Sequence, residues 1–203
     1  MLNPKLASLA KLSTLATKPE FRIRLAAELQ KIKNEGMISA DGIYEVFLQT
    51  YLFVGFPAAL ESVRALRKVF GTRNDTIPHE ADLIAEYPSF VEKGTELYQK
   101  VYATNAERVR EEMIRLSPEL AAWALVEGYG KTLSRSKLDS ITRELCIVAS
   151  LTQLGWDRQL YSHILGARNV GATGEEILEC AAIGADGDAN KFATAEQLIK
   201  KIV

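Results

Sequence analysis

Cysteine and histidine are scarce in this chain. Of its 203 residues, only Cys146, Cys180, His79 and His163 belong to these two types. The two cysteines lie far apart in apolar segments and form no Cys-x-x-Cys, so the sequence predicts two reduced, buried thiols and no disulfide framework or dithiol site. With two histidines and no second carboxylate aligned with His163, the sequence predicts no metal centre.

Excess charge and long apolar runs are also lacking. The 25 basic and 26 acidic residues give a formal net charge of -1, which provides no positive field for a nucleic acid. Because no apolar run approaches the roughly 18 residues of a membrane span, we expect a soluble, cytoplasmic protein with no membrane partner. The lysine-interrupted leucines of residues 1–21 favour an amphipathic first helix over a transit peptide.

Apolar residues recur at three- and four-residue spacing, which predicts an all-α fold. We expect helices over Phe21–Ile32, Ile43–Phe53, Ala58–Phe70, Ala106–Leu116, Leu120–Tyr129, Leu138–Leu151, Trp156–Val170, Glu175–Ile183 and Asn190–Ile202. Ser117-Pro118-Glu119 and Thr173-Gly174-Glu175-Glu176 have the composition of helix starts. Gly71–Pro78 is the strongest loop signal, and it divides the chain unevenly.

A weak repeat relates the two sides of that loop. Phe21–Gly36 and Trp156–Gly171 each run from an aromatic residue through a predicted helix to a glycine, and a second apolar helix follows in both. The sequence therefore predicts two degenerate tandem repeats that pack against each other. Residues 1–72 would form the first repeat, and residues 73–203 would supply connecting helices and the second repeat.

Glu144 and His163 are the most informative polar residues of the second repeat. They lie on either side of a helix break near Gly155, so a helical hairpin would bring them together. In the repeat register they correspond to Leu9 and Glu28, so we expect one intact site per chain. A carboxylate beside an imidazole among apolar neighbours is suited to proton transfer.

The second repeat resembles the carboxymuconolactone decarboxylase family, within the superfamily that includes the alkylhydroperoxidase AhpD. The resemblance is carried in order by Ser134–Leu145, by Tyr161-Ser162-His163 and by Ala167–Ile177, while Ile43–Phe70 is similar to the closing helices of the same domain. It leaves roughly residues 72–98 as a connection and implies an AhpD-like helical fold.

The peroxidase branch of this superfamily carries a Cys-x-x-Cys whose second cysteine lies four residues before the histidine. Here those positions are Trp156 and Gln159, so no thiolate is available to attack a peroxide. The resemblance then implies the decarboxylase branch, which works without metal or organic cofactor. A small carboxylated lactone or a related acid would be the substrate, with His163 as proton donor and Glu144 as its partner.

The substrate carboxylate requires a cation. Arg143 would point roughly 100° away from Glu144 around the helix, so Arg135 is the favoured candidate. Arg143 would have a structural role, as an ion pair with another subunit. Trp156 and Gln159 are candidate substrate-binding residues, although core packing for Trp156 and a solvent-facing position for Gln159 remain open.

Two further functions stay open. The Glu144/His163 pair would equally satisfy two buried polar groups in a small-molecule-binding or scaffold protein. Thiol-dependent peroxide reduction remains only through the superfamily link. The resemblance also implies a homo-oligomer, with a trimer as the first expectation for a duplicated chain.

Overall fold

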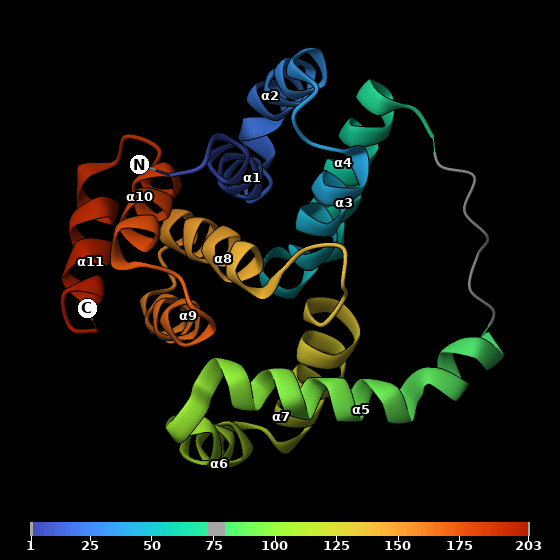
Figure 1. Ribbon diagram of the computed structural model, residues 1–203, viewed down its shortest axis with the longest axis vertical. Coiled ribbons are helices and arrows are strands. Elements are labelled where there is room, and N and C mark those ends of the chain that lie inside the picture. The colour runs from blue at the N-terminus through green and yellow to red at the C-terminus, as the bar shows by residue number, and fades with distance from the viewer. Residues whose placement is uncertain (1, 73–79, 203) are drawn as a thin grey trace. The chain divides into compact units, whose positions relative to one another are not determined.

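The computed structural model describes residues 2–72 and 80–202, and within these ranges it contains helices and no strand. The predicted all-α class is therefore confirmed. The chain forms two compact units, of which the first combines Met1–Thr72 with Lys137–Val203 and the second is Arg73–Ser136. Figure 1 traces the order of the helices.

The first unit contains two sets of helices that are distant in sequence. Its amino-terminal part contains α1 (Pro4–Leu15), the 3₁₀ turn η1 (Pro19–Phe21), α2 (Arg22–Glu35), α3 (Ala40–Gln49) and α4 (Tyr51–Phe70). Its carboxy-terminal part contains α8 (Ser140–Leu154), α9 (Asp157–Val170), α10 (Gly174–Ala185) and α11 (Ala189–Ile199). The helices expected in these regions all occur, with bounds shifted by a few residues.

Side-chain caps explain where several of these helices begin. Ser39 accepts a hydrogen bond from Gly42 N, and Asp139 accepts one from Thr142 N at the start of α8. The capping box expected at Thr173 is present, because the Thr173 hydroxyl accepts from Glu176 N while the Glu176 carboxylate accepts from Thr173 N. These local signals fix the starts of the helices that surround the candidate site.

Helix α8 is the centre of the first unit and packs against α1, α9 and α10. Where it meets α1, the hydroxyls of Ser13 and Ser150 lie 2.7 Å apart, and Ser13 also donates to the Cys146 carbonyl. Where it meets α10, Gly184 allows the backbones to touch, because an added Cβ would lie 2.3 Å from the Ala149 carbonyl oxygen. Eleven other buried residues pack with Cys146 in one apolar cluster: Leu9, Leu12, Leu15, Ala16, Leu25, Leu29, Ile32, Ile43, Val46, Phe47 and Leu66.

The second unit corrects one expectation. No helix was expected between Phe70 and Ala106, but Glu80–Tyr102 forms the long helix α5, with Pro88 inside it. The short 3₁₀ turn η2 (Ala103–Asn105), α6 (Ala106–Leu116), α7 (Pro118–Trp123) and the π-helix η3 (Ala124–Leu133) follow. The expected start of α7 is present, since Ser117 caps it by accepting from Leu120 N. Most of the predicted loop Gly71–Pro78 lies outside the described residues.

The core of the second unit is a contact between α5 and η3. Tyr98, Tyr102 and Tyr129 are buried there with ring centroids 4.5 to 5.9 Å apart, and the Tyr129 hydroxyl donates to that of Tyr102. Burial raises the pKa of the Tyr98 hydroxyl above its usual value. This small aromatic core explains why the segment forms a unit of its own.

One boundary between the two units falls after Thr72, where the first repeat was expected to end, but residues 137–203 belong to the first unit. The predicted division into domains stays a prediction. Residues 137–203 pack with residues 1–72, in the manner of two associated halves. The order α1 to α4 parallels the order α8 to α11, and α2 and α9 both end at a glycine in the left-handed conformation. The duplication itself stays a prediction.

One helical stretch, Ala40–Phe70, is long and apolar enough to cross a membrane by length and composition alone. The expectation that no apolar run approaches this length is therefore met only in part, and the expected absence of a membrane partner stays a prediction. The stretch consists of α3 and α4, and Gly55 interrupts its helical geometry with φ 77°. It also contains the buried, ion-paired Glu45, and core helices of water-soluble proteins pass the same test.

Candidate functional site

The helix break at Gly155 brings Glu144 and His163 together. Gly155 ends α8 in the left-handed conformation, with φ 71°, which glycine adopts without steric cost. Helix α9 starts two residues later at Asp157 and runs back along α8. Glu144 stands near the start of α8 and His163 in the middle of α9, so the predicted hairpin and the predicted meeting of these residues are both present.

The His163 ring donates a hydrogen bond from Nδ1 to Oε2 of Glu144 over 2.7 Å. A carboxylate can only accept, so Nδ1 carries a proton in this contact and, in the neutral ring, Nε2 carries the lone pair. Both residues are largely buried, with 3% of Glu144 and 8% of His163 exposed. Burial strengthens the hydrogen bond and holds the ring in one orientation.

Two polar atoms of the pair take no part in its hydrogen bond. In the described part of the chain, neither His163 Nε2 nor Oε1 of Glu144 has a hydrogen-bond partner. Among the described residues, the Tyr98 hydroxyl is the only fully buried side-chain nitrogen or oxygen that lacks a hydrogen-bond partner. Nε2 and Oε1 therefore each retain some solvent-exposed area, although both residues are largely buried.

Phe53 of α4 completes the surroundings of the imidazole. Its ring meets the His163 ring edge-on, with the centroids 5.5 Å apart. An aromatic edge contact restrains the imidazole and lowers the polarity around it. Sequence reasoning missed Phe53 because α4 lies about a hundred residues upstream of α9 and the sequence carries no signal for their contact.

The three predicted substrate-binding residues lie in different places. Trp156, directly before α9, is 57% exposed, so the alternative of core packing was wrong. Gln159 is exposed one turn before His163, on the same face of α9. Arg135 is exposed and belongs to the second unit, whereas the pair belongs to the first. The roles of all three stay predictions.

Arg143 has an intrachain partner, which corrects the expected ion pair with another subunit. Its Nη2 lies 2.8 Å from Oε2 of Glu45 on α3, and both side chains are buried. The predicted structural role of Arg143 fits this contact. Sequence reasoning had no means of pairing two residues from opposite halves of the chain.

The cysteines do not supply reactive thiols. Burial raises the pKa of the Cys146 thiol well above its usual value, and that of Cys180 to about 12. Since the thiolate is the reactive form, neither residue is activated for attack on a peroxide at neutral pH. In residues 2–72 and 80–202, no group of three or more potential ligand side chains is arranged for a metal ion. The predicted independence from metal and organic cofactors stays a prediction.

Comparison with known proteins agrees with the resemblance read from the sequence. Residues 119–200 match the Carboxymuconolactone decarboxylase family, and this segment contains both Glu144 and His163. Peroxisomal protein 2 of Schizosaccharomyces pombe is 30% identical over 138 residues, which cover 66% of this chain and 62% of that protein. The resemblance predicted from the sequence is thus shown for residues 119–200, the segment that matches the carboxymuconolactone decarboxylase family.

Proposed function

We propose that this protein is an enzyme that decarboxylates a small carboxylated lactone or a related acid without a cofactor. The observation that carries the proposal is the hydrogen bond of His163 to Glu144, which leaves Nε2 of a largely buried ring without a partner in the described part of the chain. The match of residues 119–200 to the family supports the reaction class. Arg135, Trp156 and Gln159 remain the candidates for substrate binding.

The proposed reaction begins with an unsaturated carboxy-lactone. The bond to the carboxylate carbon breaks, carbon dioxide leaves, and the electron pair stays on the substrate as a dienolate. Protonated His163 then donates the Nε2 proton to a substrate carbon, which restores the neutral lactone. Glu144 holds the ring through Nδ1 during both steps, and water returns the proton to Nε2 afterwards. General acid catalysis of this kind contributes about 10²–10⁴-fold to the rate.

Release of carbon dioxide from a panel of carboxylated lactones and keto acids tests this function. We expect turnover of at least one panel member by the parent and a loss of about 10²-fold or more in His163→Ala. His79→Ala is the matched control, because it removes the other histidine of the chain. Activity of His163→Ala within a few-fold of the parent would reject the proton-donor role.

The near-complete burial of the pair favours a second candidate, a binding or scaffold protein without turnover. In that case Glu144 and His163 join α8 to α9 and satisfy each other. Saturable binding of a panel compound without product, together with a lowered unfolding temperature of His163→Ala, would support this candidate. Thiol-dependent peroxidase activity is the least supported function, given the buried thiols.

We also propose that the chain assembles into a homo-oligomer, with a trimer as the first expectation. Large apolar side chains on the surface support association: Ile23, Phe56, Leu60, Ile84, Leu116, Leu120 and Trp123 are each more than half exposed. Analytical ultracentrifugation tests the assembly state. A cytoplasmic location remains a proposal, since the fission-yeast relative is named as a peroxisomal protein, and cell fractionation tests it.

A further inference from the structure

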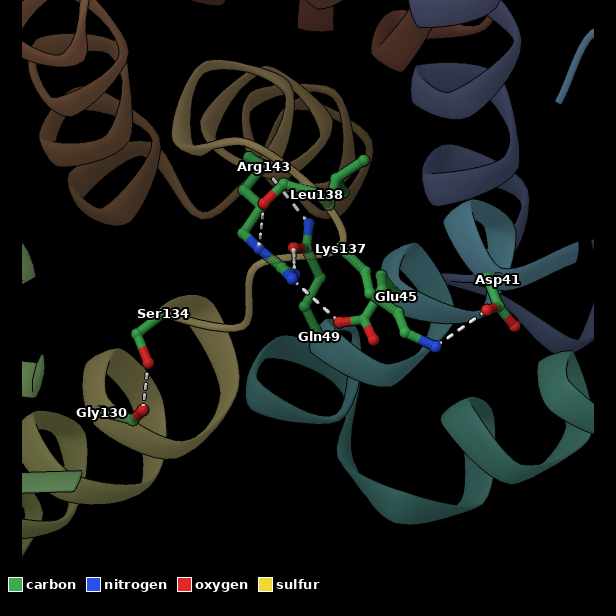
Figure 2. A network of polar contacts seen from close by, with 8 residues as sticks. All are labelled: Asp41, Glu45, Gln49, Gly130, Ser134, Lys137, Leu138 and Arg143. Carbon is green, nitrogen blue, oxygen red and sulfur yellow. Dashed lines mark hydrogen bonds and ion pairs between the residues drawn. The ribbon is translucent and has the colours of Figure 1, made fainter. Parts of the chain in front are cut away.

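Arg143 lies in a buried polar network that joins α8 to α3 (Figure 2). Its guanidinium donates from Nη2 to Oε2 of Glu45 over 2.8 Å, from Nη1 to Oε1 of Gln49 over 3.1 Å, and from Nε to the Leu138 carbonyl over 3.2 Å. Gln49 returns a hydrogen bond from Nε2 to the Arg143 carbonyl oxygen over 3.3 Å. A planar fork of donors makes these contacts simultaneously, which a lysine cannot do.

The network contains a complete ion pair in the interior. The Arg143 side chain is 2% exposed and that of Glu45 is fully buried. Buried charges are costly to desolvate, so the pair is a poor means of adding stability and is better suited to fixing one arrangement of the helices. A second ion pair, from Lys137 Nζ to Oδ2 of Asp41 over 2.8 Å, joins the segment before α8 to the start of α3.

Glu144 and Phe53, the two residues that contact the His163 ring, are both connected to this network through the chain. Arg143 directly precedes Glu144 on α8, and the two side chains leave the helix about 100° apart. Arg143 is held by α3 on one side, and Glu144 meets α9 on the other. Helix α3 continues after Thr50 into α4, which carries Phe53 against the imidazole.

We propose that Glu45, Gln49 and Arg143 are positioning residues that hold Glu144 against His163 Nδ1 and thereby keep Nε2 of the neutral ring unprotonated. The catalytic meaning of this role rests on the proposed function. The positioning role itself is a statement about the tautomer of the His163 ring, and this tautomer can be measured without any substrate.

Nitrogen-15 NMR of histidine-labelled protein tests the proposal, because the two ring-nitrogen shifts of a neutral imidazole report which nitrogen carries the proton. We expect the parent to show a single Nδ1–H tautomer for His163. The double variant Glu45→Met/Arg143→Met removes both buried charges together, so it leaves no unpaired charge and should fold. It should show mixed tautomers, with the two nitrogen shifts drawn together.

Two milder variants keep the test decisive if the double variant fails to fold. Gln49→Leu retains the ion pair but loses the link to the Arg143 carbonyl, and Arg143→Lys retains the charge but loses the fork. Both should move the nitrogen shifts in the same direction by a smaller amount. Arg24→Met is the matched control, because it breaks an exposed arginine–carboxylate pair with Asp186; it should leave the tautomer unchanged.

Parent-like nitrogen shifts in the folded double variant, or in both milder variants, would overturn the positioning role and leave the network a purely structural one. A parent without the Nδ1–H tautomer would overturn it as well. Failure of the proposed function is recognised separately, as absence of carbon dioxide release with the tautomer intact.

Discussion

Replacing Gly184 with alanine tests how closely α8 and α10 pack. An added Cβ would lie 2.3 Å from the Ala149 carbonyl oxygen and 2.8 Å from the Ala149 Cα. These are backbone atoms of α8, so no side-chain rotation relieves the overlap and the two helices must separate. Overpacking of this kind costs about 1–3 kcal/mol. Alanine regains at most about 1 kcal/mol over glycine through its helix propensity.

Because the overlap is with backbone atoms, we expect a cost near the upper end, about 3 kcal/mol, so Gly184→Ala should lower the free energy of unfolding by about 2 kcal/mol. For a chain of this size, each kcal/mol corresponds to a change of about 2–4 °C in the unfolding midpoint. Urea unfolding followed by tryptophan fluorescence measures the change. A Trp123→Phe background leaves Trp156 as the reporter for the first unit.

Gly42→Ala is the matched control for this prediction. Gly42 is also helical and in the first unit, but a Cβ there meets only side-chain atoms, of Ser39 at 3.6 Å and of Ile38 at 3.7 Å. These are ordinary contacts, so the substitution should raise stability by up to about 1 kcal/mol. A Gly184→Ala protein as stable as the parent would refute the reasoning, as would equal destabilisation by both substitutions.

The remaining predictions concern titration, thiols and a surface ion pair. Burial raises the pKa of the Asp139 carboxyl, but hydrogen bonds from the Thr142 N–H and hydroxyl outweigh it and hold the pKa below its usual value. A depressed pKa gives stability that is present above the unfolded-state pKa and is lost as the pH falls through the folded-state pKa. The urea midpoint of Asp139→Asn should therefore fall less steeply than that of the parent between about pH 6 and pH 2. Equal slopes for the two proteins would contradict this. Because burial raises the pKa of both thiols, Ellman's reagent should label Cys146 and Cys180 only after denaturation, and rapid labelling of the native protein would contradict their burial. Arg24→Ala should lower stability by less than about 1 kcal/mol in urea titrations, since its pair with Asp186 is partly exposed; a larger loss would mean that the pair is shielded from solvent.

Much of the fold was predictable because its signals are local. Ser117 and Thr173 are cap residues with their partners three positions ahead, and Gly155 ends α8 by a conformation that it adopts easily. The pairing of Glu144 with His163 was predictable for the same reason, since a hairpin brings together two positions 19 residues apart. Short-range geometry thus specified the central contact of the candidate site.

Features that depend on distant contacts were not predictable. The partner of Arg143 is Glu45, 98 positions away, and no property of either residue identifies the other. Helix α5 was missed because the family resemblance left residues 72–98 as a connection, whereas the helix continues through Pro88. Trp156 was expected in the core or against substrate, and its position directly before α9, where it is more than half exposed, excludes only the core. Tertiary packing, which one sequence does not encode locally, decided each case.

The discontinuous first unit has a consequence for biosynthesis. Helices α1 to α4 leave the ribosome before the segment Arg73–Ser136, and α8, against which α1 packs, follows only after that segment. The face of α1 that packs against α8 must therefore stay uncovered while more than sixty further residues are translated. We expect nascent chains stalled before α8 to bind chaperones and to be cut by proteases, and release from both to begin once α8 emerges.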